Sequence, residues 1–334
     1  MSVRHRPMLP SDVRQCADIV AAHPNVGPRY GSAIAHLRTA WLRLVADDGF
    51  CSAVVFEEGD GAQAKMLGVG ATVFVSDDFL RKMKTPPLFW IGPELAKRVA
   101  QDDSPLLTWN QVQEANSRDG LNLVVWQATV CAEASQRGDV WNHLMVSFMD
   151  HHRGYFLKEL TAHAESVEHM MAMRNTGGYL FDCEKLRYAD FPEGNFEDVV
   201  RAPHLIGVTR EMTQEKWGSW VGSLFLYQPP RFGFARSEQR LLLAALDGGT
   251  DEELSVKLGI SVSAVKKTWL MIYQRAAACL PEPAPANLQA DDEKLERGRD
   301  KKQRLISYLR EHHEELRPSS RKLLRQNGAP SDLA

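Results

Sequence analysis

The chain has 334 residues, of which 44% are hydrophobic and 25% are charged, and its formal net charge is −3. This length suits two domains, and this composition excludes a wholly disordered protein. A net charge of −3 is unusual for a nucleic-acid binder, but DNA meets the local charge and not the average over the chain.

The cysteine pattern and the absence of long apolar runs indicate the cellular compartment in which the protein is expected. The five cysteines are Cys16, Cys51, Cys131, Cys183 and Cys279, and none belongs to a Cys-x-x-Cys pair. Their odd number and scattered spacing argue against a disulfide scaffold or a zinc site. The sequence contains neither an apolar signal region near its start nor a run of eighteen apolar residues. We therefore expect a cytoplasmic protein with no membrane partner.

Helix-like and strand-like segments alternate over the first half of the chain. Apolar spacing predicts helices at 11–22 and 33–46, and an antiparallel hairpin of strands at 51–56 and 67–75. The next expected elements are a strand at 121–130, a helix at 139–152, a strand at 156–163, a helix at 166–174 and a strand at 179–183. Together they indicate an α+β domain over 1–190 with a mixed, mostly antiparallel sheet.

The second half is expected to hold a connecting region at 191–234, a helical domain at 235–279, and a Pro-rich linker with a charged helix at 280–334. Within this last segment, 291–326 contains eleven Lys and Arg against eight Asp and Glu. Its apolar positions, among them Leu305, Leu309 and Leu316, are sparse. We expect a solvated helix, or an auxiliary arm that contacts phosphates or a dimer partner.

Residues 235–279 contain the start and stop signals of three consecutive helices. Ser237 is expected to cap the first helix, and Thr250 with Glu253 forms a capping box for the second. Gly259 supplies a sharp turn, Ile260 is expected in the core, and Ser261 caps the third helix. The third helix buries a stripe formed by Val265, Trp269, Ile272 and Ala276.

The opposite side of the third helix carries the expected DNA-binding residues. They are Ser261, Ser263, Lys266, Lys267, Thr268 and Leu270. Two adjacent lysines would attract phosphates, while short neighbouring side chains could reach base edges in the major groove. A three-helix interaction module is the alternative, because 231–275 contains seven Lys and Arg against five Asp and Glu, a net charge of only +2.

About forty residues of this region resemble the LuxR/FixJ-type helix-turn-helix family. The matching positions are Leu246-x-Gly248-Gly249-Thr250, the turn Gly259-Ile260-Ser261, the pair Val265-Lys266 and the closing pair Ile272-Tyr273. The resemblance implies a transcriptional regulator that binds double-stranded DNA as a homodimer, with the helix at 262–275 in the major groove. Two positions depart from the family pattern. Ala264 stands where Thr is usual, and Thr268 stands where His is frequent and often approaches phosphate.

The order of elements in the first domain resembles the GNAT acyltransferase fold, as do Arg6-Pro7-x-x-Pro-Ser11-Asp12 and Asn175-Thr-Gly-Gly178-Tyr179 near its two ends. This second resemblance implies an acetyl-CoA site at a loop before a helix, where bare N–H groups hold the pyrophosphate. The expected loop residues are Gln136, Arg137 and Gly138. Asp139 and Val140 occupy positions where small residues belong, so the loop is degenerate.

We therefore expect a small-molecule or acyl-CoA sensor, or a dimerisation domain, and no obligatory cofactor. An active N-acetyltransferase whose helical C-terminus binds a partner is the alternative. Its general base would be a Glu or a water chain; Glu133 is a candidate, although a carboxylate at the end of a strand is more often only solvated. We expect no metal site at His151, His152, His163 and His169, since their spacing forms no ligand ladder. Gly68-Val-Gly70 lies within a strand, which favours close packing over a dinucleotide site.

Overall fold

The protein is described by a computed structural model that covers residues 2–47, 50–58, 64–85, 88–164, 204–214, 219–279, 298–320 and 322–323. The chain divides into two compact units. The first comprises Met1–Val112, Gly120–Arg153 and Leu157–Phe225, and the second comprises Gln113–Asp119, Gly154–Phe156 and Leu226–Ala334. Because the chain passes between the units several times, neither unit is one continuous segment.

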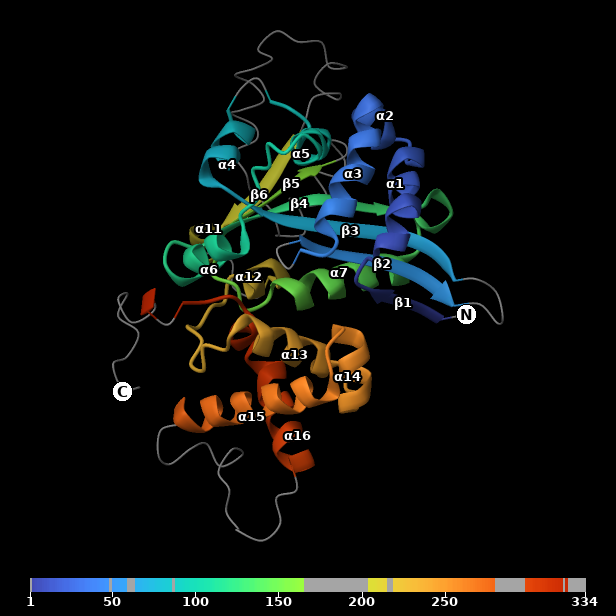
Figure 1. The fold of residues 1–334 in the computed structure, drawn as a ribbon. Helices are drawn as coiled ribbons and strands as arrows, with labels where there is room; N and C mark the ends of the chain where they lie inside the picture. Colours follow the sequence, from blue (N-terminus) through green and yellow to red (C-terminus); the bar gives the residue numbers. More distant parts are fainter. Residues whose placement is uncertain are drawn as a thin grey trace. The chain divides into compact units, whose positions relative to one another are not determined.

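The first unit is built on a six-stranded sheet in the order β1-β2-β3-β4-β5-β6. Its strands are β1 (Ser2–Arg6), β2 (Phe50–Glu58), β3 (Lys65–Val75), β4 (Leu121–Val130), β5 (Leu157–Ala164) and β6 (His204–Thr209). Neighbouring strands are antiparallel except β4 and β5, which are parallel (Figure 1). The expected α+β class with a mixed, mostly antiparallel sheet is confirmed.

Two irregularities of β4 shape the middle of this sheet. The register with β3 shifts between Ala71 and Thr72, which leaves Trp126 as the extra residue of a bulge. The parallel pairing with β5 ends at Val124–Thr161, although both strands continue beyond it. The second halves of β4 and β5 therefore lie apart and leave room between them.

Helices cover the sheet of the first unit (Figure 1). They are α1 (Val13–Ala22), α2 (Gly27–Tyr30), α3 (Ile34–Leu44), α4 (Asp77–Met83), α5 (Ile91–Ala100), α7 (Gly138–His152), α11 (Arg210–Gln214) and α12 (Trp220–Leu224). Helix α7 packs against β1, β2 and β3. At this contact a Cβ on Gly68 or Gly70 would lie 3.6 or 3.4 Å from Leu144. A Cβ on Gly68 would also lie 3.2 Å from the Thr129 carbonyl oxygen of β4, so the expected close packing of strands is supported at Gly68.

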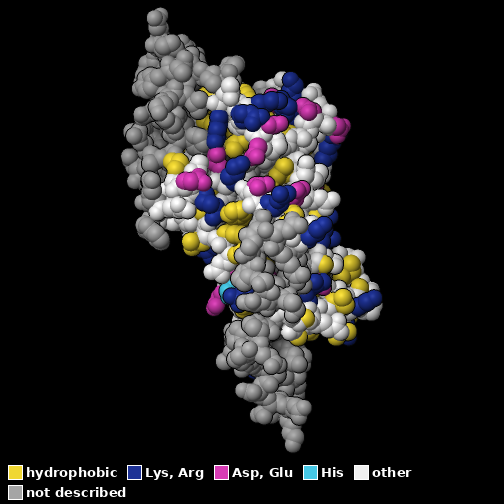
Figure 2. Space-filling view, turned by 90° about the vertical axis from the view of Figure 1, so that its left-hand side faces the viewer, with side chains coloured by type: hydrophobic (Ala, Val, Ile, Leu, Met, Phe, Trp, Pro, Cys, Tyr) yellow, Lys and Arg dark blue, Asp and Glu magenta, His cyan; other side chains and the backbone are white. Residues whose placement is uncertain are grey.

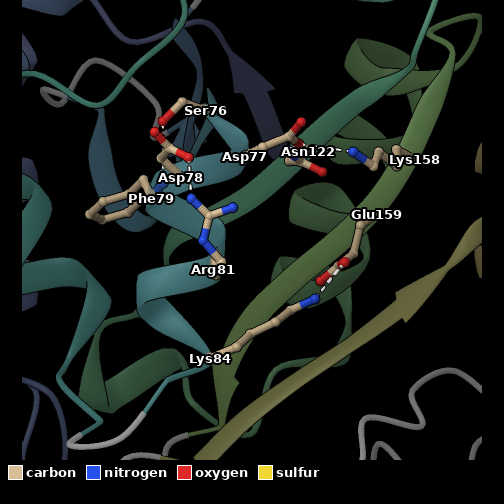
Figure 3. Close-up of polar contacts among 9 residues, drawn as sticks. All are labelled: Ser76, Asp77, Asp78, Phe79, Arg81, Lys84, Asn122, Lys158 and Glu159. Atoms are coloured by element: carbon tan, nitrogen blue, oxygen red, sulfur yellow. Dashed lines mark hydrogen bonds and ion pairs between the residues drawn. The ribbon is translucent and has the colours of Figure 1, made fainter.

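Polar contacts hold the paired ends of β4 and β5 (Figure 3). Lys84, which follows α4, forms an ion pair of 2.6 Å with Glu159, a buried side chain of β5. Asp77 accepts a hydrogen bond of 2.6 Å from Asn122 of β4 and forms an ion pair of 2.9 Å with Lys158 of β5. The hydrogen bond from Asn122 holds the pKa of Asp77 below its ordinary value, which keeps its carboxylate charged.

The second unit is helical and has a single hydrophobic cluster among its described residues. Its helices are α13 (Arg236–Leu246), α14 (Asp251–Leu258), α15 (Val262–Cys279) and α16 (Gly298–Glu311), with the 3-10 turn η4 (His313–Leu316). The cluster includes Leu241, Leu242, Leu254, Val265, Trp269, Ile272, Leu305, Leu309 and Leu316. Residues of all four helices and of η4 thus share one core.

An N-terminal part of the chain also belongs to the second unit. Helix α6 (Trp109–Ser117) contributes Asn116, whose amide nitrogen donates to the Pro318 carbonyl over 2.7 Å. Its amide oxygen accepts from the Phe156 N–H, also over 2.7 Å. Asn116 is 1% exposed, so this one side chain satisfies backbone groups from two distant segments inside the unit.

Several expectations differ from the structure. The connecting region at 191–234 contains β6, α11 and α12, because Leu205, Ile206 and Val208 bury their side chains against the sheet. The helix near the C-terminus is not solvated: Leu309 is 0% exposed and packs in the core of the second unit. Strand β1 and helices α4, α5 and α6 were not expected. The expected helix at 166–174 and strand at 179–183 lie outside the described residues.

Candidate functional site

The turn between α14 and α15 has the conformation that its sequence predicts. Thr250 accepts from the Glu253 N–H and Glu253 accepts from the Thr250 N–H, which completes the capping box of α14. Gly259 ends α14 at φ +65°, and no atom lies within 4 Å of a Cβ built there. Glycine is therefore favoured by the left-handed backbone and not by crowding.

Two other local expectations were wrong. The N-cap of α13 is Ala235, whose N–H donates to the carboxylate of Glu238 over 2.6 Å, and Ser237 lies exposed within the helix. Ile260 is 41% exposed, because the chain has already turned away from the core when it leaves Gly259. The apolar residue type at this position, directly after a glycine turn, therefore did not predict burial.

The outer face of α15 presents the residues expected to meet DNA. Ser263, Lys266, Lys267 and Leu270 are exposed, whereas Val265, Trp269 and Ile272 are buried on the opposite side. Among the residues that the structure describes, neither lysine has a hydrogen bond or an ion pair. Their ammonium groups are therefore available to an external anion.

The hydroxyl groups on this helix take part in its own structure. Ser261 accepts from the Ala264 N–H over 3.2 Å, which confirms it as the cap of α15, and it lies 3.0 Å from the Ser263 hydroxyl. Thr268 donates to the Ala264 carbonyl over 2.9 Å. Its hydroxyl proton is thus occupied, and the phosphate contact expected from Thr268 would require this bond to break.

Helix α16 braces the turns around α14. Arg310 donates to the Leu246 carbonyl over 2.9 Å at the end of α13, and Lys302 donates to the Gly249 carbonyl over 3.2 Å. Lys302 also lies 5.0 Å from the ring centre of Trp269 and 3.4 Å from Asp251. Both basic side chains thus fix backbone groups and an aromatic ring within the unit.

The surface charge supports only a local electrostatic argument. On the face drawn in Figure 2, Lys and Arg side chains are intermixed with Asp and Glu side chains. This mixture agrees with the small net charge of −3.

The loop expected to bind acetyl-CoA has its cation engaged. Gly138 begins α7, and Arg137 is the N-cap residue. The guanidinium of Arg137 forms ion pairs of 2.8 Å with Glu57 and 2.7 Å with Asp139, and these carboxylates raise its pKa further above the ordinary value. Asp139 places a negative charge in the first turn of α7, where a pyrophosphate would have to lie.

A cavity of about 280 Å³ opens where β4 and β5 lie apart. Its walls come from α2, β2, β3, α5, β4, α7, β5, β6 and α12, and they include Tyr30, Trp90, Trp126, Trp141, Phe148, His163 and Trp220. Arg29 lies over the Trp90 ring, with 3.9 Å from its guanidinium carbon to the ring centre. The cavity wall is thus largely apolar, with several aromatic rings and, among the described lining residues, one guanidinium.

The buried polar groups of the cavity wall bond to one another. Tyr30 donates to Gln127 over 3.0 Å, and Gln127 donates to Thr129. His152 Nδ1 lies 2.6 Å from the Phe148 carbonyl and its Nε2 lies 2.8 Å from the Thr72 hydroxyl. Nδ1 therefore carries a proton and donates to the Phe148 carbonyl. These contacts fix the shape of the cavity and leave its inner surface mostly apolar.

Sequence reasoning did not find this cavity. Arg29, Trp90 and Trp126 belong to three separate elements, and no local pattern relates them. His151, His152 and His163 were considered as metal ligands, and all three line the cavity. Among the described residues no group of three or more His, Cys, Asp or Glu side chains could hold a metal, and His169 lies outside them. Glu133 lies exposed in a 3-10 turn after β4, away from the lining residues.

No family model, curated protein or solved structure matches the chain. In the part of the chain that the structure describes, no helix has both the length and the apolar character to span a bilayer.

Proposed function

We propose that the chain is a sequence-specific DNA-binding regulator of transcription that acts in the cytoplasm. In this proposal α15 enters the major groove of a two-fold promoter site, and the protein binds as a homodimer. The first unit senses a small molecule. The observation that supports DNA binding best is the pair Lys266 and Lys267, exposed and without protein partners within the described residues, on a helix that follows a left-handed turn.

Each residue of the outer face has its own part in this proposal. Lys266 and Lys267 supply attraction to phosphates, which positions the helix without reading sequence. Ser263 and Leu270 face base edges, and the 56% exposed side chain of Leu270 suits contact with a thymine methyl group. Ser261 acts mainly as the cap that sets the direction of the helix.

The test is a double substitution, Lys266→Ala with Lys267→Ala, on DNA selected by the wild-type chain from a random library. Because the homodimer carries two copies of each lysine, four phosphate contacts are lost, and the slope of log affinity against log salt concentration should fall by about 4. Thermal stability should hardly change, because both side chains are exposed and neither has a hydrogen bond or an ion pair within the described residues. Lys97→Ala, an exposed lysine of the first unit, is the control and should leave the slope unchanged.

Two outcomes would contradict the proposal. The wild-type chain could fail to enrich any DNA from the library, or it could bind with an affinity that does not depend on salt. Either result would favour the helical interaction module as the role of α13–α15.

An active acetyltransferase remains the second candidate, and the strand order supports it. Four antiparallel strands followed by a parallel β4–β5 pair that separates halfway resemble the GNAT fold. The ion pairs of Arg137 and the charge of Asp139 oppose pyrophosphate binding at Gln136–Gly138. We therefore expect neither heat stabilisation by acetyl-CoA nor acetyl transfer to amines. Measurable acetyl transfer would instead make the acetyltransferase the first candidate and the DNA-binding regulator the second.

A further inference from the structure

The cavity between β4 and β5 has a wall chemistry that selects one kind of ligand. In the part of the chain that the structure describes, its lining contains one permanently charged side chain, Arg29, and no carboxylate. An anion is therefore the charged group that the lining favours, because it gains attraction from Arg29 and meets no negative side chain of the wall.

The rest of the lining favours a flat apolar body. Trp90, Trp126 and Phe148 provide ring faces and edges, and the polar groups beside them are already paired with protein atoms. Trp90 contacts both Arg29 and the ring of His163, whose centre lies 5.1 Å away. A ligand whose ring lies beside Trp90 would thus place an acidic substituent close to the guanidinium of Arg29.

We propose that this cavity binds a small aromatic carboxylate. The carboxylate meets Arg29, and the ring packs between Trp90, which directly precedes α5, and the aromatic side chains of β4 and α7. A guanidinium has five N–H donors, so Arg29 can bind a carboxylate through two of them and keep its contact with Trp90 and its other contacts.

The cavity volume limits the size of this ligand. About 280 Å³ lies just below the usual range of about 300–1,000 Å³ for small-molecule sites, so the ligand must be small, with about 10–15 non-hydrogen atoms. A one-ring or two-ring carboxylic acid has this size. The ligand class itself does not depend on DNA binding. That this ligand is the signal sensed by the first unit, however, rests on the proposed regulatory function.

The probe is 2-naphthoate, and 2-naphthamide is its neutral control of the same shape. Isothermal titration calorimetry on the full chain without DNA should show binding of the acid at least tenfold tighter than binding of the amide. Arg29→Gln should remove this preference, and Arg29→Lys should keep part of it, since lysine keeps the charge without the planar fork. Arg14→Gln, an exposed arginine of α1, should behave as the wild type.

Equal affinity for the acid and the amide would overturn the proposal, as would an unchanged preference in Arg29→Gln. Failure of both compounds to bind at millimolar concentration would do so too. Circular dichroism of each variant shows whether it is folded, and Arg29→Lys gives an independent reading if Arg29→Gln unfolds. Because no DNA is present, these results stand apart from the test of Lys266 and Lys267.

Discussion

Among single residues, Glu315 shows how burial couples stability to pH. Its side chain is buried in η4, where the carboxylate accepts from the Arg231 N–H over 2.7 Å and from the Phe232 N–H over 2.9 Å. Burial raises the pKa of Glu315 to about 7, although these two hydrogen bonds favour the charged form. The Glu315 side chain thus holds the segment before α13. Its charged form nevertheless destabilises the folded state relative to its protonated form.

The free energy of unfolding should therefore fall as the pH rises from about 4.5 to about 7. In that range the folded chain keeps a proton on Glu315 that the unfolded chain releases. The loss from this group should be on the order of 3 kcal/mol. Glu315→Gln cannot titrate, so urea unfolding between pH 5 and pH 8 should show a smaller decline. Glu311→Gln, an exposed control in α16, should decline as the wild type does.

At the scale of elements, α16 is a structural part of the second unit. Leu309 is 0% exposed, and its neighbours in the cluster come from α13 and α15. Leu309→Ala should lower the free energy of unfolding by about 3 kcal/mol, since it leaves a cavity in a closed core. Urea unfolding measures this loss. Val256→Ala on α14, where the side chain is 83% exposed, should change stability by less than about 0.5 kcal/mol. Equal effects would mean that α16 does not pack there.

Elements defined by local signals were predictable from the sequence. The capping box of Thr250 and Glu253 and the glycine turn at Gly259 each depend on residues a few positions apart. Helix α16 was misjudged because its two core leucines, Leu305 and Leu309, look sparse until α13 is placed beside them. Strand β6 was missed because prolines dominate the sequence around it, and only pairing with β5 makes it a strand. The cavity of Arg29 and Trp90 depends on tertiary contacts that no local pattern contains.

At the scale of the whole molecule, the end of the described chain completes the second unit. Besides the bond from Asn116 to Pro318, Gln113 donates to the Ser319 carbonyl over 2.9 Å and the Ser320 N–H donates to Ser117 over 2.7 Å. These contacts join α6 to a segment about two hundred residues later. Since the partners on α6 are largely buried, their loss would leave polar groups without bonds.

A chain that stops after Glu311 should therefore lose the second unit as a folded body. It lacks Glu315, the buried Leu316 and the partners of Asn116, and the combined loss should be at least about 3 kcal/mol. Limited proteolysis should then cut within 226–311 under conditions in which the wild type is resistant. A chain that stops after Leu323 keeps these contacts and should resist like the wild type. Equal resistance of both truncated chains would contradict this account.

The bond between Asn116 and Pro318 also sets the order of events during synthesis. A ribosome releases residues in sequence, so Asn116 emerges long before the carbonyl that it binds. Until Pro318 has left the exit tunnel, the Asn116 side-chain amide, which is buried in the folded unit, has no Pro318 carbonyl to bind and contacts water or a chaperone instead. The helices that carry Lys266 and Lys267 emerge earlier, but their core is closed by leucines that are translated later. Nascent chains should therefore acquire a stable second unit only after Pro318 has emerged from the ribosome.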